Sequence, residues 1–319
     1  MILLLQYTLI FAAVLLLVAL GGCFSEHSGV INIGLEGIMV IGALGGALVM
    51  RFMPYDNATA TFATRFGMFG MVALASVAAG VLFSLLLAVA CINFKADQTI
   101  VGTAMNLLGT AAATVIVKSM NTAANPDDHS SEIMYFDQKK AFISNIGSFE
   151  LNWFLVLAAI LLVVSIILLY KTRFGLRLRA CGEHPQAADS VGINVFRMRY
   201  AGVLISGLLG GLGGITYITV GVSLWKFENG VAGFGFLSLA VMIFGAWDPI
   251  KIGGAALLFG LFRALGNVHA GIPFLANLEL PSAIYNMLPY IVSLIVLAFT
   301  SKKSRAPKAE GIPYDKGQR

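Results

Sequence analysis

The chain has 319 residues, of which 58% are hydrophobic and 12% are charged. Soluble globular proteins carry about 25% charged residues, so the composition excludes an ordinary soluble domain and indicates a polytopic helical protein in a lipid bilayer. The net charge of +5 does not indicate a nucleic-acid partner, because the basic residues cluster at the ends of apolar stretches. The three cysteines are far apart and form no CxxC motif, so we expect neither a metal site nor a disulfide framework.

Nine apolar stretches, most of them near the 20 residues that cross a bilayer, predict an all-α bundle of about nine spans. Their expected bounds are 2–22, 30–50, 68–92, 99–117, 153–170, 200–222, 232–247, 250–268 and 284–300. Span 232–247 is short and ends before Asp248-Pro249, which predicts a broken or re-entrant helix. No basic segment precedes Ile2–Leu20, so we expect the first span to be retained rather than cleaved as a signal peptide.

Lysine and arginine residues predict the orientation of the bundle. They concentrate in the loop 171–199 and in the tail 301–319, so both segments are expected to be cytoplasmic. The two assignments agree, because an even number of spans lies between them. The N-terminus and the loop 118–152 are then extracellular. Arg51 and Arg65 also fall outside, which conflicts with the rule.

A weak internal similarity predicts an inverted repeat. Gly29–Gly34, GVINIG, is similar to Gly230–Gly235, GVAGFG. We expect one transmembrane domain, 1–300, followed by the basic tail 301–319. Its parts would be a first repeat 1–117, an extracellular loop 118–152, a linker span 153–170, the cytoplasmic loop 171–199 and a second repeat 200–300. An inverted repeat in a transporter places the substrate path near the midplane, although glycine-rich stretches also match each other by chance.

The loop 171–199 contains the pattern of a short helix. Its residues are Glu183, His184, Pro185, Gln186, Ala187, Ala188, Asp189, Ser190, Val191 and Gly192. Pro185 suits the first helical turn and Gly192 suits the C-terminal cap. On the residues alone, this helix either transmits force from a partner protein or is an ordinary surface helix.

Two motifs resemble bacterial ABC-importer permeases. Arg177–Ile193, RLRACGEHPQAADSVGI, is similar to the coupling segment of the branched-chain amino acid, ribose and nucleoside permeases. Phe24–Gly37, FSEHSGVINIGLEG, is similar to an early motif of that family, most closely of its nucleoside (simple-sugar) branch. The similarity covers roughly residues 20 to 300 and implies that the helix Glu183–Gly192 docks on an ATP-binding subunit.

The resemblance further implies a subunit of the bacterial cytoplasmic membrane that imports nucleosides by alternating access. Its expected partners are an ABC ATP-binding subunit, a second permease subunit and an extracellular substrate-binding lipoprotein. The sequence has no Walker motif, so ATP would be bound by the partner, and we expect no cofactor and no enzymatic activity in this chain. The alternatives are a permease for ribose-like sugars or branched-chain amino acids, a stand-alone secondary transporter, and a membrane scaffold.

Glu36 is the sharpest candidate for the substrate path, because a carboxylate within a span is costly and usually faces the interior or water. Asn32 lies four residues earlier and is predicted on the same helix face. The two residues either line the path, or bond neighbouring helices and cap a broken helix. The weaker candidates are Met105, Asn106, Asn229, Phe234 and Ser238, of which Phe and Asn suit a nucleobase but are equally ordinary packing residues.

Overall fold

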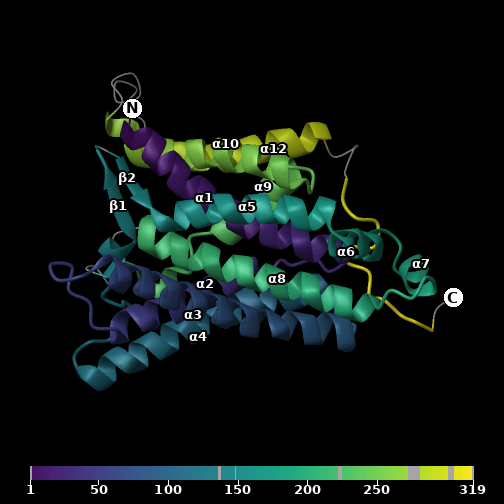
Figure 1. The fold of residues 1–319 in the computed structure, drawn as a ribbon, viewed down its shortest axis with the longest axis horizontal. Helices are drawn as coiled ribbons and strands as arrows, with labels where there is room; N and C mark the ends of the chain where they lie inside the picture. The colour runs from purple at the N-terminus through teal and green to yellow at the C-terminus, as the bar shows by residue number, and fades with distance from the viewer. Residues whose placement is uncertain are drawn as a thin grey trace.

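The computed structural model describes residues 2–135, 138–147, 149–221, 225–271, 281–300 and 305–317. Long helices lie roughly side by side along the longest axis of the molecule (Figure 1). Helices α6 and α7 and the C-terminal segment lie at one end, which we call the α7 end. The N-terminus and the strands β1 and β2 lie at the opposite end, which we call the hairpin end (Figure 1).

The elements follow the predicted order. The helices are α1 Ile2–His27, α2 Leu35–Phe52, α3 Phe62–Ala88, α4 Gln98–Ala124, α5 Trp153–Lys171, α6 Arg173–Glu183, α7 Pro185–Ser190, α8 Val195–Thr216, α9 Phe234–Phe244, α10 Pro249–Val268 and α12 Ser282–Thr300. Helices α3 and α8 continue as the π-helical turns η1 Val89–Asn93 and η3 Tyr217–Gly221, and the short 3-10 helices are η2 Gln138–Phe142, η4 Phe227–Asn229 and η5 His269–Gly271. The strands β1 Ile143–Ile146 and β2 Phe149–Asn152 pair antiparallel, with Ile143 opposite Asn152.

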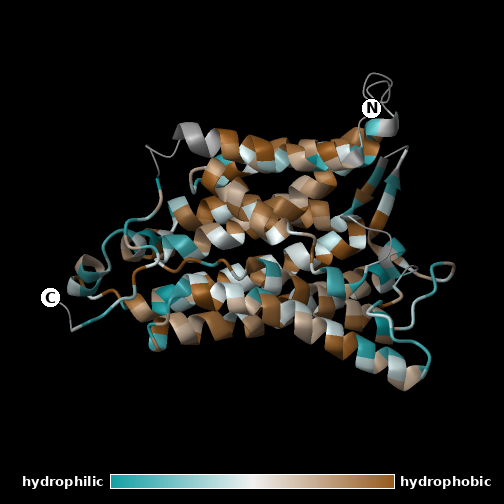
Figure 2. Cartoon of the chain, turned by 180° about the vertical axis from the view of Figure 1, so that it is seen from behind, coloured by the Kyte–Doolittle hydropathy of each residue, from teal (hydrophilic) through white to brown (hydrophobic). Residues whose placement is uncertain are grey.

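Among the described residues, eight helical stretches are long and apolar enough to cross a membrane. They correspond to the first eight predicted spans, and the ninth falls in α12, where 283–295 forms a shorter apolar helix. Figure 2 shows hydrophobic residues through the middle of the bundle and hydrophilic residues gathered at its two ends. The all-α, multi-pass prediction is therefore confirmed, with the small β1–β2 hairpin as an addition. Helix α9 alone, at 11 residues, is too short to cross a bilayer.

Local sequence explains where most helices begin. A helix leaves its first N–H groups without partners, and Asp, Asn, Ser or Thr at the preceding position supplies a side-chain acceptor. In this chain the capping residues that accept such a hydrogen bond are Thr61, Asp97, Asn152, Thr172, Asn194 and Asp248. The starts of α2 and α9, like that of α7, lack a side-chain cap at the preceding residue.

Helix α1 forms the centre of the bundle, because it packs against α10 on one side and α8 on the other. Beside it, α2, α3 and α8 cross at glycines. A Cβ on Gly42 would overlap the Cα of Gly211, so the backbones touch directly. At the same crossing the hydroxyl of Ser76 lies 2.8 Å from the carbonyl oxygen of Gly42 and 2.7 Å from that of Gly211.

The two arginines that conflict with the orientation rule are held by polar groups at the hairpin end. Arg51 donates from Nη1 to Oδ1 of Asn121 at 2.6 Å. Arg65 donates from Nε to the carbonyl of Ala141 at 3.0 Å and from Nη2 to the carbonyl of Ile143. Its guanidinium also lies 5.6 Å from the centroid of the Trp153 ring. These contacts give both positive charges a local structural role.

Candidate functional site

Two helices begin inside the bundle rather than at its ends, and their starts meet. Helix α2 follows the non-helical segment 28–34, in which Gly29 has a φ of +91°. Helix α9 follows a turn in which Gly233 has a φ of +77°. Helices α2 and α9 are in contact. Interrupted helices with N-terminal N–H groups exposed near the midplane are typical of substrate sites in transporters.

Glu36 accepts hydrogen bonds from backbone N–H groups at the start of α9. Its Oε1 accepts the N–H of Gly233 at 2.8 Å, and its Oε2 accepts the N–H of Gly235 at 2.7 Å. Glu36 is 8% exposed, and a negative charge at a helix N-terminus is favourable. A Cβ on Gly235 would lie 2.5 Å from the backbone nitrogen of Glu36, so a glycine is required there. The geometry is that of a helix cap, and contact of Glu36 with substrate stays a prediction.

Asn106 of α4 satisfies the start of α2 in the same way. Its Oδ1 accepts the N–H of Gly37 at 2.8 Å, and its Nδ2 donates to the carbonyl of Ile33 at 2.9 Å. Its neighbour Met105 is buried and packs against Gly34. One side chain from another helix therefore holds each interrupted start: Asn106 holds α2, and Glu36 of α2 holds α9.

The prediction that Asn32 and Glu36 share a helix face is wrong, because α2 begins only at Leu35. Asn32 lies in the non-helical segment and is fully buried. Its Nδ2 donates to the hydroxyl of Ser206 on α8 at 2.8 Å. Its Oδ1 has no hydrogen-bond partner among the described residues. The four-residue spacing therefore does not bring the two side chains together.

The three candidates of the second half differ in their surroundings. Phe234 is 1% exposed, with its ring centroid 4.7 Å from that of Tyr217 and 5.3 Å from the guanidinium of Arg263. Ser238 donates to the carbonyl of Phe234 at 2.7 Å. Asn229 is exposed at the end of η4, apart from the other two. The structure thus gathers Phe234 and Ser238, but not Asn229, at the start of α9.

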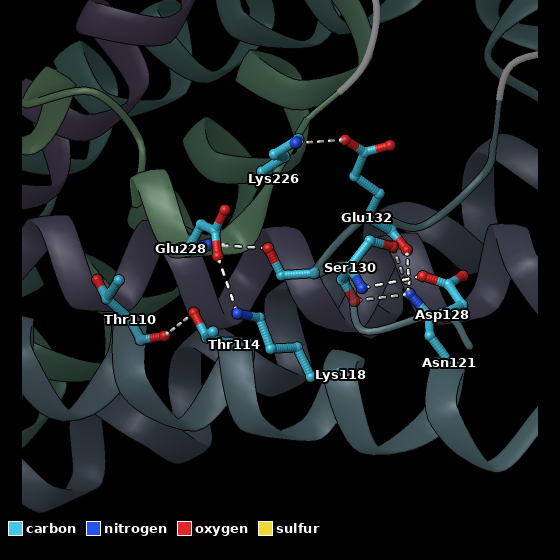
Figure 3. Close-up of polar contacts among 10 residues, drawn as sticks. Thr110, Thr114, Lys118, Asn121, Asp128, Ser130, Glu132, Lys226 and Glu228 are labelled. Atoms are coloured by element: carbon cyan, nitrogen blue, oxygen red, sulfur yellow. Dashed lines mark hydrogen bonds and ion pairs between the residues drawn. The ribbon is translucent and has the colours of Figure 1, made fainter. Parts of the chain in front are cut away.

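A polar cluster toward the hairpin end was not found from the sequence (Figure 3). The ammonium of Lys118 on α4 lies 3.0 Å from a carboxylate oxygen of Glu228, and that of Lys226 lies 3.3 Å from Glu132. Glu132 and Lys226 also form an isolated antiparallel backbone bridge. These contacts join the loop that follows α4 to the segment that leads into α9. The partners lie more than 90 residues apart, so local spacing carries no signal for them.

A row of polar side chains on α4 connects this cluster with Glu36. Thr110, Thr114 and Lys118 are four residues apart and so lie on one helix face, as Figure 3 shows. The hydroxyl of Thr114 donates to the carbonyl of Thr110 at 2.8 Å. A Cβ on Gly230 would lie 3.6 Å from Oγ1 of Thr110 and 3.7 Å from Oε1 of Glu36. The row therefore ends beside the cap of α9.

At the α7 end, the short helix predicted over 183–192 is confirmed as α7, with Pro185 in its first turn. Gly192 follows it at a φ of +84°, the conformation expected of a C-terminal glycine. Pro185 and Ala188 are buried, whereas Glu183, His184, Gln186, Ala187, Ser190, Val191 and Gly192 are exposed. Asp189 is half-buried. Helix α7 therefore presents one face to the bundle and the other outward.

Comparison with known proteins identifies a family and several full-length relatives. Residues 4–297 match the family model described as branched-chain amino acid transport system / permease component. The chain is 42% identical to the guanosine ABC transporter permease protein NupQ of Bacillus subtilis (strain 168), with 98% of this chain and 96% of NupQ covered. It is 39% identical to the nucleoside ABC transporter permease protein NupC of Lactococcus lactis subsp. cremoris, with 97% and 96% covered.

A third relative, TsgC13 of Haloferax volcanii, is provisionally named a glucose ABC transporter permease and is 28% identical over 93% of this chain and 91% of TsgC13. All three alignments run through the interrupted helices, the polar row and α7. The family model alone covers 4–297, which includes all of the eight described spans except the first two residues of α1. The chain therefore belongs to this family of ABC-transporter permease components, membrane-embedded transport subunits without catalytic activity of their own.

Proposed function

We propose that this chain is the permease subunit of an ATP-driven importer of nucleosides. The observation that carries the proposal is sequence identity near 40% over almost the full length to two permeases named for guanosine and for nucleosides. Identity over the full length supports the substrate class better than a match to a single motif, because the substrate path is formed by the whole membrane domain. The lower identity to TsgC13 makes sugars the second candidate, and branched-chain amino acids follow from the family description alone.

The α7 end is cytoplasmic in this proposal, with the N-terminus and the hairpin end outside. The basic residues of the loop 171–199 support this orientation. The outward face of α7 docks on the ABC ATP-binding subunit, which binds and hydrolyses ATP, so this chain needs no cofactor. A second permease subunit, different from this chain, and an extracellular substrate-binding lipoprotein complete the importer in the bacterial cytoplasmic membrane.

The substrate path runs past the meeting point of α2 and α9. We base this on the two interrupted helices and on the polar row of α4, because half-exposed polar groups within a span are expensive to place against lipid. Glu36 and Asn106 shape the path by holding the helix starts. The two halves of the chain, 1–117 and 200–300, form an inverted repeat, a proposal supported by the matching glycines before α2 and α9.

Uptake measurements test the proposal. Cells carry the chain with its ATP-binding subunit, second permease subunit and binding protein, or lack only this chain, and receive labelled guanosine, ribose or leucine. Loss of guanosine uptake alone is the expected result. Loss of ribose or leucine uptake instead would keep the importer and correct the substrate. Uptake that depends on an ion gradient but not on ATP would support the stand-alone secondary transporter.

A further inference from the structure

The C-terminal segment 305–317 folds back over the α7 end of the bundle instead of extending away from it (Figure 1). We call it the C-terminal strap. Pro307, Ala309 and Tyr314 are buried in it, and Ala309 and Tyr314 are only 6% and 4% exposed. Side chains of a free basic tail would be exposed to solvent, so the strap is part of the packed structure.

The first half of the strap is tied to the ends of α6 and α1. The N–H of Ala309 donates to the carbonyl of Gly182, near the end of α6, at 2.8 Å. Gly311 has a φ of +75°, and a Cβ there would lie 2.9 Å from Cδ1 of Ile31. The carboxyl group of Glu310 interacts with that of Glu26 at the end of α1.

Glu26 extends this contact to the turn between α9 and α10. Its Oε2 accepts the indole N–H of Trp247 at 2.5 Å. Trp247 and Ala246 both have positive φ values, +56° and +51°, which are uncommon for residues other than glycine. The strap therefore rests on a turn whose backbone conformation the surrounding contacts must hold in place.

The second half of the strap lies under α7. The Tyr314 ring packs edge-on against Phe196 of α8, with centroids 5.5 Å apart. Burial and the nearby carboxylate of Asp189 on α7 both raise the pKa of the Tyr314 hydroxyl. Tyr314 also belongs to one apolar cluster with Ala188 and Cys181. It is the largest side chain of that cluster, which packs against the inner face of α7 at Ala188.

Tyr314 also covers a buried charge at the start of α8. Arg199 is 1% exposed, and its Nε and Nη2 have no hydrogen-bond partner among the described residues. Its guanidinium lies 5.9 Å from the centroid of the Tyr314 ring, within the range of a cation–π interaction. Such a charge is costly when nothing compensates it, so Tyr314 stabilises α8 as well as α7.

One ion pair connects the end of the strap with the first half of the chain, and a second connects it with α7. Asp315 lies 2.8 Å from the ammonium of Lys95, in the turn between α3 and α4. Lys316 lies 3.9 Å from Asp189 of α7. Both pairs are partly exposed, so each contributes little by itself. What matters is which elements they connect, because through them the strap joins α7 to helices of both halves of the chain.

Helix α7 has only six residues, and a helix of this length is not stable without tertiary packing. We propose that the C-terminal strap is the positioning element of α7, with Tyr314 as its principal positioning residue. It holds α7 to α8 and to the α3–α4 turn, so that a displacement of α7 moves the ends of several spans together. This inference rests on the proposed function, in which α7 receives that displacement from the ATP-binding subunit.

The test uses the complete importer in lipid vesicles and measures guanosine uptake and ATP hydrolysis in the same sample. Tyr314→Ala removes the ring, Tyr314→Phe keeps the ring and removes the hydroxyl, and Ile312→Ala truncates an exposed side chain of the same strap. We expect Tyr314→Ala to raise the amount of ATP hydrolysed per guanosine taken up, because hydrolysis by the partner subunit continues while α7 transmits less of its displacement. Tyr314→Phe should change the ratio less, and Ile312→Ala should leave it unchanged.

A merely structural role of the strap gives a different result. Uptake and ATP hydrolysis would then fall together with the amount of assembled importer, their ratio would stay constant, and the inference would be wrong. Guanosine uptake by vesicles with the wild-type importer shows whether the positioning role alone is wrong or the proposed function is wrong as well. If they take up guanosine, an unchanged ratio in Tyr314→Ala overturns only the positioning role. If they take up none, both are overturned.

A cross-link provides a second measurement if Tyr314→Ala does not assemble. Asp189→Cys and Lys316→Cys place two thiols where the structure has an ion pair, and the native cysteines Cys23, Cys91 and Cys181 are buried. A short bis-maleimide then fixes the strap to α7 in the assembled importer. We expect uptake to continue, because the strap and α7 move as one unit. Loss of uptake on cross-linking, with the single-cysteine variants active, would contradict the proposal.

Discussion

Replacing Glu36 by glutamine separates a structural role of this carboxylate from a direct contact with substrate. The glutamine side chain has nearly the same shape, but its amide has one acceptor oxygen in place of two and no charge. One of the N–H groups of Gly233 and Gly235, now held at 2.8 and 2.7 Å, would face an amide N–H₂ group. That N–H group at the start of α9 would then lack the acceptor that the carboxylate now supplies.

The expected loss of stability follows from the loss of one of those hydrogen bonds and of the negative charge. A hydrogen bond to a charged group contributes about 1.5–3 kcal/mol, and a negative charge at a helix N-terminus contributes about 0.3–1 kcal/mol more. We therefore expect Glu36→Gln to lower the free energy of unfolding by about 2–4 kcal/mol. For a chain of this size the unfolding temperature should fall on the order of 5 °C.

The assay compares the unfolding temperature of the purified importer with the guanosine concentration at half-maximal uptake. A lower unfolding temperature with unchanged half-maximal concentration is the expected result. Asn106→Asp is a matched control, because it alters the side chain that holds the start of α2 and leaves Glu36 and the start of α9 unchanged. An unchanged unfolding temperature with a raised half-maximal concentration would refute the capping role of Glu36 and indicate direct substrate contact.

Three further predictions follow from packing, exposure and titration. Gly214→Ala places a methyl group onto a carbonyl oxygen of α2 and should cost about 1–3 kcal/mol or more, seen as loss of protein from the membrane, whereas Gly67→Ala meets no atom within 4 Å and should be tolerated. Ala187→Arg, on the exposed face of α7, should abolish uptake and co-purification of the ATP-binding subunit at normal membrane abundance. Burial raises the pKa of Glu310, so docking of the strap should be tightest at acidic pH and weaken as pH rises through that raised pKa; the labelling rate of a cysteine at the buried Ala309, divided by that of a free thiol at the same pH, should rise accordingly, and Glu310→Gln should reduce that rise.

The exposure of α7 changes which substitution tests docking. From the sequence, Ala188 is as good a docking residue as Ala187, and Ala188→Arg is expected to abolish uptake. In the structure Ala188 is 4% exposed and packs with Cys181 and Tyr314. Arginine there would disturb the support of α7 as well as its outer face. Ala187 tests docking alone, because only the outer face changes.

Local signals made much of the fold predictable. The apolar stretches are long, and side-chain caps such as Asp97 and Asp248 lie directly before the helices that they start. The helix at 185–190 was predictable for the same reason, because Pro185 and Gly192 mark its two ends within a few residues. Where structure is determined within one turn of the chain, the sequence carries the information.

The candidate site was less predictable, because its hydrogen bonds span long sequence separations. Glu36 bonds to Gly233 and Gly235 almost 200 residues away, and Asn106 bonds to Gly37. The prediction that Asn32 and Glu36 share a helix face required a helix that includes Asn32, whereas α2 begins only at Leu35 and so separates the two residues. The role of Tyr314 was hidden for the same reason: no pattern near the C-terminus indicates that it packs under α7.

The segment 225–233 is anchored unequally at its two ends. At the start of α9, two charge-assisted hydrogen bonds to a buried carboxylate hold it, and each contributes about 1.5–3 kcal/mol. Toward the hairpin end, the Lys118–Glu228 pair is 43% exposed at both side chains, and such pairs contribute about 0–1 kcal/mol. Alternating access requires that one end of a path open while the other stays closed. If the segment moves in the cycle that we propose, its side-chain contacts are weaker at the hairpin end, where backbone hydrogen bonds such as that from Phe227 to Ser131 must also break, while Glu36 keeps α9 attached to α2.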